Sequence, residues 1–423
     1  MKSFLIMLLA WGGAQANAEL VLPEALKIQP VLDMTYAIFH SEKNYNDPAA
    51  QHAVSWQEAY AKYGLQAEYH GQDSLWSANI IGISSATFGD GDAGGFTTGK
   101  ERKTSIEEWR LGWKNTAKNQ TDIEISLGRQ KVVVGDGFIV AGDALNLGKA
   151  LADGEVDRGG GYYLAARQSF DFTTVINLKL TENLDTHWYY LKSNNKAQYQ
   201  PTLWSTDWQY RYKNSNFGLT YLQILDLKDP LEKSIRNHLK DISFRAKTEL
   251  NQQLTLTGEY VIQKQQDRNE NAWYLAANYT FDQFKYKPTL GYRYSSFSTH
   301  YDPLFYGNTD AGFGTWFQGE VAGNYAGPMS TNAHIQQISL QSSIKENLSL
   351  GILAYQFNTI NKQSQNLDGH ELDIFAIWSP YQGLSLIPLI GFYKPKHDIN
   401  HDGTQSPDRQ MNTYTQLIVQ YVY

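Results

Sequence analysis

The chain of 423 residues has no cysteine, which excludes disulfide bonds, Cys-ligated zinc and thiol catalysis. Long apolar runs are missing too, since the stretch from Phe4 to Trp11 has about eight residues and a membrane-spanning helix needs roughly 20. Basic charge is not in excess, because 36 Lys and Arg stand against 43 Asp and Glu, a formal net charge of -7. The sequence therefore does not predict the basic surface that nucleic acid requires.

The N-terminal residues have the order of a secretory signal peptide. Lys2 precedes the apolar run, and the small-residue pattern Ala-Asn-Ala follows at 16–18. We expect cleavage before Glu19, so that residues 1–18 are a signal peptide and residues 19–423 form a single outer-membrane β-barrel domain. No Pro/Gly/Ser-rich linker and no shift in composition divides this remainder.

The composition combines two features that conflict in a soluble protein. Mean hydropathy is -0.48, which is polar, yet 13% of the residues are aromatic, with 28 Tyr and 11 Trp. A transmembrane β-barrel reconciles them, because its strands point alternate side chains at lipid and at a wet lumen, and aromatic side chains gather at both membrane interfaces.

Segments of about ten residues alternate between apolar and polar side chains, which is the period of a β-strand. Segments 107–114, 122–127 and 241–247 show it, and in segment 58–69 one face carries Ala59, Ala61, Tyr63, Leu65, Ala67 and Tyr69. Similar runs begin near Lys27, Ser74, Gly160, Phe172, Leu184, Thr202, Phe217, Leu254, Ala272, Lys285, His334, Asn347, Glu371, Leu384 and Asn412. The pattern gives about 18 or 19 strands, and we predict 18 because single-chain bacterial barrels have an even number.

The connections and the end of the chain agree with such an antiparallel barrel. Short turns such as 214–216 and 382–383 alternate with long connections such as 89–103, 134–158 and 301–332. The last segment, 416–423, alternates and ends on an aromatic residue, which resembles the signal read by outer-membrane assembly machinery. A soluble β-sandwich or propeller would not require so many aromatic side chains on one face of its strands.

Strand parity predicts a lumen of mixed charge. The expected inward basic residues are Arg110, Lys114, Arg167, Arg211, Arg245, Lys247 and Arg293, and the expected inward acidic residues are Glu68, Glu108, Glu124, Asp207 and Glu259. Guanidinium groups bind carboxylates in a planar two-point geometry, so a row of arginines would hold and relay an acidic solute. Opposite charges on one face also pair with each other, so the same residues could simply brace the wall.

Two long loops carry further candidate residues. In the first, Arg129 breaks the parity of its strand, so a bulge at Gly128 or a strand end must place it at the rim or in the pore. This loop also contains Asp136 and Asp143 and is long enough to fold inward as a constriction.

The second loop, with the preceding segment 291–295, resembles the signature of the alginate-export family of outer-membrane channels. The segments 128–130 and 135–137 are similar to that family as well, and the matching stretches cover about a fifth of the chain. The resemblance implies an 18-stranded barrel whose arginine-lined pore passes anionic polysaccharide, with gating loops and no catalysis. The residues it carries over are Arg129 and Arg293 as pore contacts and Asp302, Trp316, Gln318 and Glu320 as loop residues.

The sequence thus predicts a porin-like channel that passes anionic solutes, or an anionic polysaccharide such as alginate, by passive diffusion. An uptake porin for small organic acids or sugars is the alternative. The expected partners are outer-membrane lipids and lipopolysaccharide, the transported anion, and the barrel assembly machinery during biogenesis, but no nucleic acid.

Two other functions have weaker support. An outer-membrane enzyme would need a nucleophile with a His base at the rim, and the ten His residues are scattered. No cofactor is expected apart from a weak calcium candidate, in which Asp398, Asn400 and Asp402 match the first half of a calcium loop. The second half fails, because Arg409 stands where a bidentate Glu belongs.

Overall fold

The computed structural model describes residues 25–45, 52–117, 121–229, 234–306 and 318–423, so the predicted signal peptide, residues 1–18, lies outside the described residues. Eighteen strands form one sheet. In chain order they are β1 (Leu26–Ser41), β2 (Val54–His70), β3 (Ser74–Gly89), β4 (Arg102–Asn115), β5 (Asp122–Gln130), β8 (Phe170–Lys179), β9 (Leu184–Lys192), β10 (Thr202–Tyr212), β11 (Ser215–Asp226), β12 (Lys240–Glu249), β13 (Leu254–Lys264), β14 (Asn269–Thr280), β15 (Thr289–Phe297), β16 (Ala333–Lys345), β17 (Leu348–Thr359), β18 (Gly369–Tyr381), β19 (Leu384–Pro395) and β20 (Asn412–Val422).

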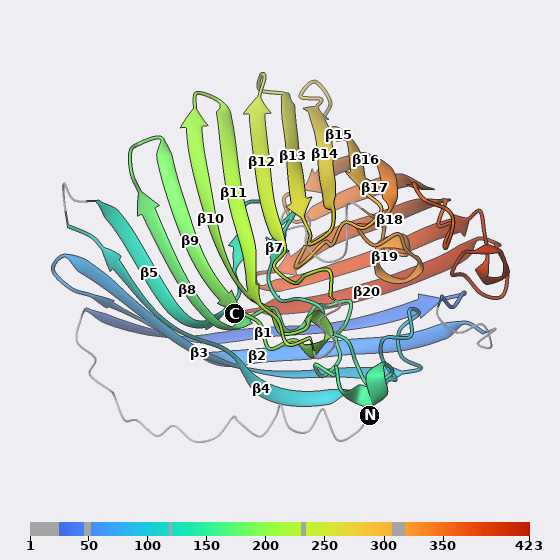
Figure 1. The fold of residues 1–423 in the computed structure, drawn as a ribbon, viewed down its shortest axis with the longest axis horizontal. Helices are drawn as coiled ribbons and strands as arrows, with labels where there is room; N and C mark the ends of the chain where they lie inside the picture. The colour runs from blue at the N-terminus through green and yellow to red at the C-terminus, as the bar shows by residue number, and fades with distance from the viewer. Residues whose placement is uncertain (1–24, 46–51, 118–120, 230–233, 307–317) are drawn as a thin grey trace.

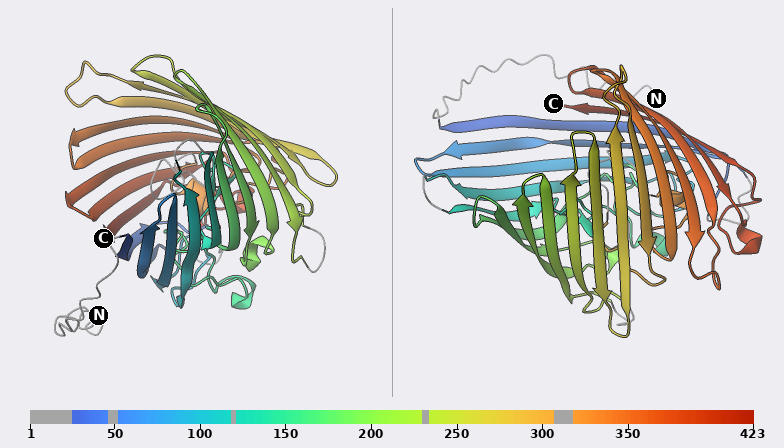
Figure 2. Two further views of the ribbon diagram at one scale, coloured as in Figure 1. Left: turned by 90° about the vertical axis from the view of Figure 1, so that its left-hand side faces the viewer. Right: turned by 90° about the horizontal axis from the view of Figure 1, so that it is seen from above.

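Each strand pairs in antiparallel fashion with its neighbour in this order, and β1 pairs with β20. The sheet therefore closes on itself, as the ring of strands in Figures 1 and 2 shows. Closure leaves no strand edge with unpaired backbone groups. The predicted closed barrel of 18 strands is confirmed.

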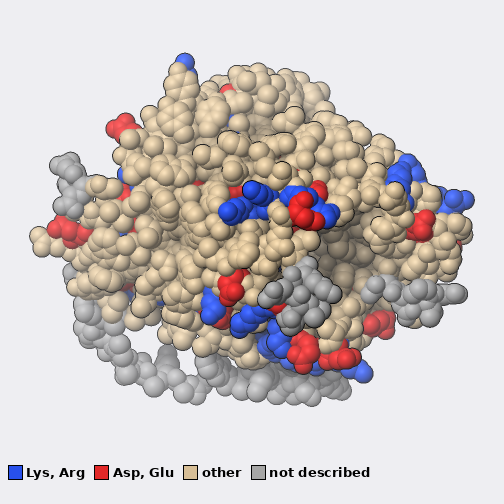
Figure 3. Space-filling view, in the orientation of Figure 1, with Lys and Arg blue, Asp and Glu red and all other residues tan. Residues whose placement is uncertain are grey.

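The outer surface of the wall is apolar, as strand parity predicts. Tyr63, Leu65 and Tyr69 of β2 are exposed, and so are Ile242 and Phe244 of β12, whereas Asp241 and Ser243 between the latter two are buried. In Figure 3 charged side chains gather over the loops in the middle of the view, and most of the surrounding strand surface carries none. Exposed apolar side chains all along the strands are what contact with lipid requires. No helix in the described part of the chain is long and apolar enough to cross a membrane.

Connections at the two ends of the barrel differ in length. At one end β10 and β11 are separated only by residues 213–214, and β18 and β19 only by residues 382–383. At the other end β5 and β8 are separated by residues 131–169, and β15 and β16 by residues 298–332. The predicted alternation of short turns with long loops is confirmed.

One predicted strand does not exist. The run near Gly160 lies in the long connection between β5 and β8, where Gly159, Gly160 and Gly161 have φ of 99°, 73° and 71°. A strand needs strongly negative φ, so the chain turns here instead of extending. This is the extra strand that made the sequence pattern count 19.

The long connections fold into the barrel and fill part of it. The short strands β6 (Val133–Val134) and β7 (Val140–Ala141) form a hairpin inside the ring. The three short 3-10 segments are η1 (Ala152–Gly154), η2 (Lys196–Gln198) and η4 (Ile399–His401), and η3 (Ala322–Ala326) is a single π-helical turn. Loop residues such as Phe138, Leu164 and Tyr325 join inward wall residues in one buried cluster. The core of this barrel therefore lies between the loops and the inner wall.

Candidate functional site

The first inward loop, residues 131–169, crosses the lumen from β5 to the opposite wall. Near its tip, Asp136 accepts a hydrogen bond from the hydroxyl of Tyr274 on β14, and the Phe138 ring lies 5.2 Å from the Tyr274 ring. Phe138 also lies 5.9 Å from Phe297 at the end of β15. A loop attached at both sides of a barrel divides its cross-section, which makes this level the candidate constriction.

The second inward loop, residues 298–306 and 318–332 of the described chain, binds the first. The backbone N–H of Ala141 donates to the Phe305 carbonyl at 2.7 Å, and the Tyr162 hydroxyl donates to the Asn324 carbonyl at 3.0 Å. The Tyr163 hydroxyl donates to the carboxylate of Glu320. Burial raises the pKa of Glu320, the Tyr163 hydrogen bond lowers it, and the nearby Glu371 carboxyl raises it, which together bring it to about 8.

The loop residues that the family resemblance supplied have structural partners. Asp302 accepts two hydrogen bonds from the Arg236 guanidinium, at 2.6 and 2.8 Å, and this planar pair ties the second inward loop to the connection after β11. Gln318 donates to the Ser330 hydroxyl within its own loop. Trp316 lies outside the described residues.

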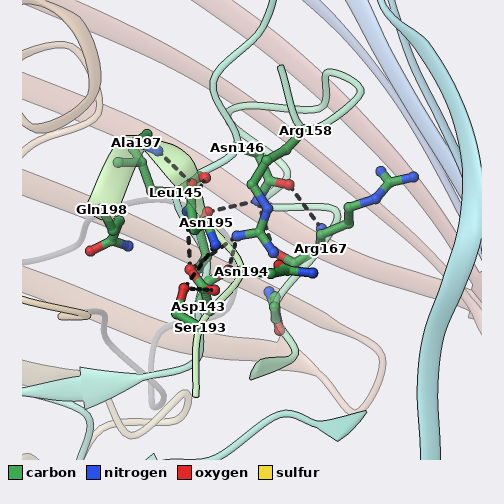
Figure 4. Close-up of polar contacts among 12 residues, drawn as sticks. Asp143, Leu145, Asn146, Arg158, Arg167, Ser193, Asn194, Asn195, Ala197 and Gln198 are labelled. Carbon is green, nitrogen blue, oxygen red and sulfur yellow. Dashed lines mark hydrogen bonds and ion pairs between the residues drawn. The ribbon is translucent and has the colours of Figure 1, made fainter. Parts of the chain in front are cut away.

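Asp143 organises the junction between the first inward loop and the connection 193–201. Its carboxylate accepts from the Arg158 guanidinium at 3.0 Å, from the Asn195 amide at 3.0 Å and from the Ser193 hydroxyl at 2.7 Å. Figure 4 shows these groups converging on Asp143, with Asn146 and Arg167 beside them. Asp143, which the sequence placed in this loop, is fully buried, and its hydrogen bonds hold the loop in shape.

Arg129 lies at a β-bulge, as the sequence predicts. The register between β5 and β8 shifts between Gly128 and Gln130, and Gly128 has φ of 129°. The Arg129 guanidinium donates to the Glu107 carbonyl at 3.0 Å and pairs with Asp171 at 2.7 Å. Only 12% of its side chain is exposed, so the bulge removes the charge from the lipid face.

Several predicted lumen charges pair with each other on the wall. Arg245 pairs with Asp207 at 2.7 Å and Arg211 with Asp185 at 2.5 Å, and the Lys114 ammonium lies 3.9 Å from Asp122. The acidic members of this set other than Asp207 form no close ion pair with Lys or Arg in the described chain: Glu259 accepts from Ser243, Glu108 accepts from Asn79, Glu68 lies 3.9 Å from His70, and Glu124 lies opposite Lys114 in the strand register. Bracing of the wall therefore explains Arg245 and Arg211.

Arg110 and Arg293 differ from those two arginines. Arg110 on β4 donates to the Ser77 hydroxyl at 3.1 Å and, within the described residues, forms no ion pair with a carboxylate. Arg293 lies over the Tyr274 ring at 3.6 Å and donates to the Ser295 hydroxyl at 3.2 Å. Lys247 on β12 is exposed. Arg110 and Lys247 thus keep positive charge available on the inner face of the strands.

Arg167 is not on a strand, which corrects the parity prediction. It lies in the first inward loop, and its guanidinium donates to the Ser85 hydroxyl and to the Lys103 carbonyl. Burial lowers the pKa of Arg167, Glu107 raises it, and the positive charges of Arg158 and Arg129 lower it, which together bring it to about 10. The alternation rule failed here because a Gly-rich loop has no strand period.

A polar cavity of about 480 Å³ lies between this loop and the wall. Five of its lining residues are basic, namely Lys103, Arg129, Arg158, Arg167 and Lys196, and two are acidic, Glu155 and Asp157. Strand parity did not predict Arg158 and Lys196 because they lie in connections without a period, and it did not predict Lys103 because this residue of β4 precedes the alternating segment 107–114. It also missed Lys131, whose pKa is lowered by burial and by the nearby charge of Lys62.

The calcium candidate forms a self-contained turn. Asp398 accepts from the backbone N–H of Asn400 at 3.0 Å and bonds to the ring of His401 at 2.7 Å, and Asp402 has φ of 67°. No group of three or more His, Cys, Asp or Glu in the described chain has the arrangement of a metal site.

Comparison with known proteins supports the fold. No family model matches the chain, and no curated protein matches its sequence. OpdQ from Pseudomonas aeruginosa matches with a TM-score of 0.59 and 12% identity, over 94% of this chain and 97% of that one. OccAB4 from Acinetobacter baumannii gives 0.60 and 12%, over 93% and 98%. The fold is that of an outer-membrane porin.

A BenF-like porin from Pseudomonas fluorescens Pf-5 matches equally well, with a TM-score of 0.59 and 11% identity over 94% of this chain and 98% of that one. At this identity the likeness concerns the fold alone. The fold and the apolar outer surface together place the barrel in the outer membrane of a Gram-negative bacterium. The resemblance to the alginate-export family receives no support from these comparisons.

Proposed function

We propose that the protein is a passive outer-membrane channel for small organic anions, and that it is not an enzyme. The observation that carries the proposal is Arg110, a basic residue on the inner wall that forms no ion pair in the described chain, although its charge acts on the neighbouring Glu108. Lys62 and Lys131 interact with each other and with Glu108, the neighbour of Arg110. Fixed positive charge in a lumen raises the local concentration of anions and repels cations.

The loops favour a small solute over a polymer. The first inward loop contacts the opposite wall at Tyr274, and the two inward loops bond to each other through Ala141 and Phe305. A solute must pass beside these contacts, which suits a compact carboxylate better than a polysaccharide chain. The fold shared with the BenF-like porin supports a channel of this class.

A charged site also distinguishes organic acids from neutral sugars. Guanidinium groups bind carboxylates through paired hydrogen bonds, and they gain no comparable ionic interaction with a sugar hydroxyl. Arg110 and the basic residues of the 480 Å³ cavity therefore favour acids within the wider class of small solutes. Anionic polysaccharide such as alginate is the competing solute, and block of the channel by uronate oligomers tests it.

The test is the reversal potential of the refolded protein in planar bilayers under a salt gradient, with a monocarboxylate, a neutral sugar and uronate oligomers added in turn. We expect anion preference, together with current noise or block from the monocarboxylate. Cation preference would contradict the proposal. Block by uronate oligomers alone would indicate the polysaccharide channel instead.

A further inference from the structure

Irregular loops inside a barrel create a shortage of hydrogen-bond acceptors. Their backbone N–H groups are withdrawn from water, and a loop without secondary structure offers few carbonyls in the right positions. A buried N–H group without an acceptor destabilises the folded protein. At three places in this barrel a carboxylate of a wall strand accepts hydrogen bonds from two backbone amides of an inward loop.

Glu58 on β2 is the first place. Its two carboxylate oxygens accept from consecutive backbone amides of the first inward loop, Tyr163 at 3.2 Å and Leu164 at 3.0 Å. The Trp56 indole N–H is a further donor at 3.3 Å. Glu58 is fully buried, and Asp92, another acid, is a charged group that acts on it.

Glu107 on β4 is the second place. One oxygen of its carboxylate accepts from the Gln168 amide at 2.7 Å and from the Ser169 amide at 3.0 Å. The side chain is fully buried, and the register shift between β3 and β4 falls at this residue. The bulge turns Glu107 inward, so that it meets the end of the first inward loop just before β8 begins.

Glu371 on β18 is the third place, and it holds the second inward loop. Its carboxylate oxygens accept from Val321 at 2.7 Å and Ala322 at 2.9 Å. Asp373, two residues along the same face, accepts from the Glu320 amide at 3.4 Å. The carboxylate of Glu320 in turn accepts from the Tyr163 hydroxyl, and the backbone amide of the same Tyr163 donates to Glu58. The two loops are thereby linked to each other, to β2 and to β18.

We propose that Glu58, Glu107 and Glu371 are positioning residues of the channel, and that these three carboxylates fix the width of the passage by holding pairs of loop amides against the wall. The statement about width rests on the proposed channel function. The statement about the amides does not. A carboxylate serves this task because its negative charge strengthens the bond to each amide. At Glu58 and Glu371 both oxygens accept, so the amide of Gln, which has one acceptor and would turn N–H donors towards a loop donor, cannot replace them, whereas at Glu107 one oxygen accepts from both amides.

The chain provides a matched control beside one of the three. Glu108 follows Glu107 on the same strand, but its carboxylate accepts from the Asn79 side chain at 3.1 Å and from no loop amide among the described residues. Glu107→Gln and Glu108→Gln therefore remove the same charge from adjacent positions. Only the first removes the charge from an acceptor of loop amides and so weakens those bonds.

The experiment measures amide hydrogen exchange of the refolded full-length protein in detergent micelles, together with single-channel recordings. In the wild type we expect the six amides of Tyr163, Leu164, Gln168, Ser169, Val321 and Ala322 to be protected. In Glu107→Gln we expect exchange at Gln168 and Ser169 to be roughly ten-fold faster or more, because hydrogen bonds to a charged acceptor are the strong ones. Glu371→Gln should do the same at Val321 and Ala322, and Glu108→Gln at none of the six.

In the recordings, Glu107→Gln and Glu371→Gln should show larger or noisier open-channel currents than Glu108→Gln. If all six wild-type amides exchange as fast as exposed loop amides, the proposal is overturned, even should a variant fail to fold. Equal exchange in Glu107→Gln and Glu108→Gln would also overturn it. If the amides exchange as expected but neither the wild type nor the variants conduct, the carboxylates hold the loops and the proposed channel function is wrong.

Discussion

Two arginines on the inner wall show how similar sequence positions acquire different roles. Arg245 on β12 and Arg110 on β4 both alternate with outward apolar residues. Arg245 donates to Asp207 at 2.7 Å and to the Thr220 hydroxyl at 2.8 Å. Arg110 donates to the Ser77 hydroxyl alone among the described groups.

The difference lies in what the neighbouring strands present. Asp207 is fully buried and accepts from Thr220, Gln209 and Arg245, so its charge and that of Arg245 cancel inside the wall. Arg110 donates to a serine of β3 and forms no ion pair in the described chain, and Glu108 beside it is an acid on which its charge acts. The side of the barrel at Arg245 is therefore braced by an ion pair, whereas the side at Arg110 keeps a charge that can act on a solute.

Breaking the braced side should give the largest effect. Asp207→Asn removes the ion-pair partner of the buried Arg245 and leaves only Glu259 and Asp136 to act on its charge without an ion pair. Removing one partner of a buried pair costs about 3–5 kcal/mol in unfolding free energy. The measurement is urea unfolding of the refolded barrel. As a control, Asp185→Asn removes the partner of the more exposed Arg211 and should cost less than about 1 kcal/mol. Equal losses would show that burial does not distinguish the two pairs.

The contact between the inward loops should give an intermediate effect that depends on pH. In a released loop Glu320 would titrate near its ordinary value of 4.5, whereas in the closed structure its pKa is raised to about 8. The closed state therefore holds the proton more tightly, so loop attachment is strongest below about pH 4.5 and weakens as pH rises towards 8. Amide exchange at Tyr325 and Ala326, corrected for intrinsic rates, should accelerate over this range.

Glu320→Gln supplies the control for this pH dependence. Glutamine keeps an acceptor for the Tyr163 hydroxyl but has no proton to lose. Exchange in the variant should be independent of pH after the intrinsic correction. A pH dependence that persists in the variant would assign the effect to other groups, of which Glu371 is the nearest.

The sequence predicts well on which face of the strands Arg110 and Arg245 lie, but not which partners they bind. Period-two alternation identified the strands and the inward faces that carry Arg110 and Arg245, because a strand has only two faces and lipid excludes charge from one of them. It could not identify Asp207 as the partner of Arg245, since that contact joins residues two strands apart in the sheet. It misplaced Arg167 because loop residues have no period, and it missed Glu58 and Glu371 as loop anchors because those contacts join distant segments.

Ion selectivity tests the role of Arg110, and the expected energy is smaller than in the two preceding predictions. A unit charge about 10 Å from a permeating ion in water contributes about 0.4 kcal/mol, which corresponds to roughly a two-fold change in permeability ratio. Arg110→Gln should reduce anion preference by about this factor and leave unfolding unchanged. The measurement is the reversal potential under a salt gradient. Unchanged selectivity would move the anion-selective charge elsewhere in the lumen.

The smallest effect is expected where charges are paired but fully accessible. Lys196 and Glu155 lie 2.7 Å apart at the edge of the 480 Å³ cavity, with 56% and 74% of their side chains exposed. Water solvates both ends, so Glu155→Gln should leave urea unfolding unchanged within error. The same substitution frees the Lys196 charge, which should slightly increase anion preference. A stability loss as large as that of Asp207→Asn would mean that the contact is buried in the membrane-inserted protein, and the cavity would then belong to the braced side.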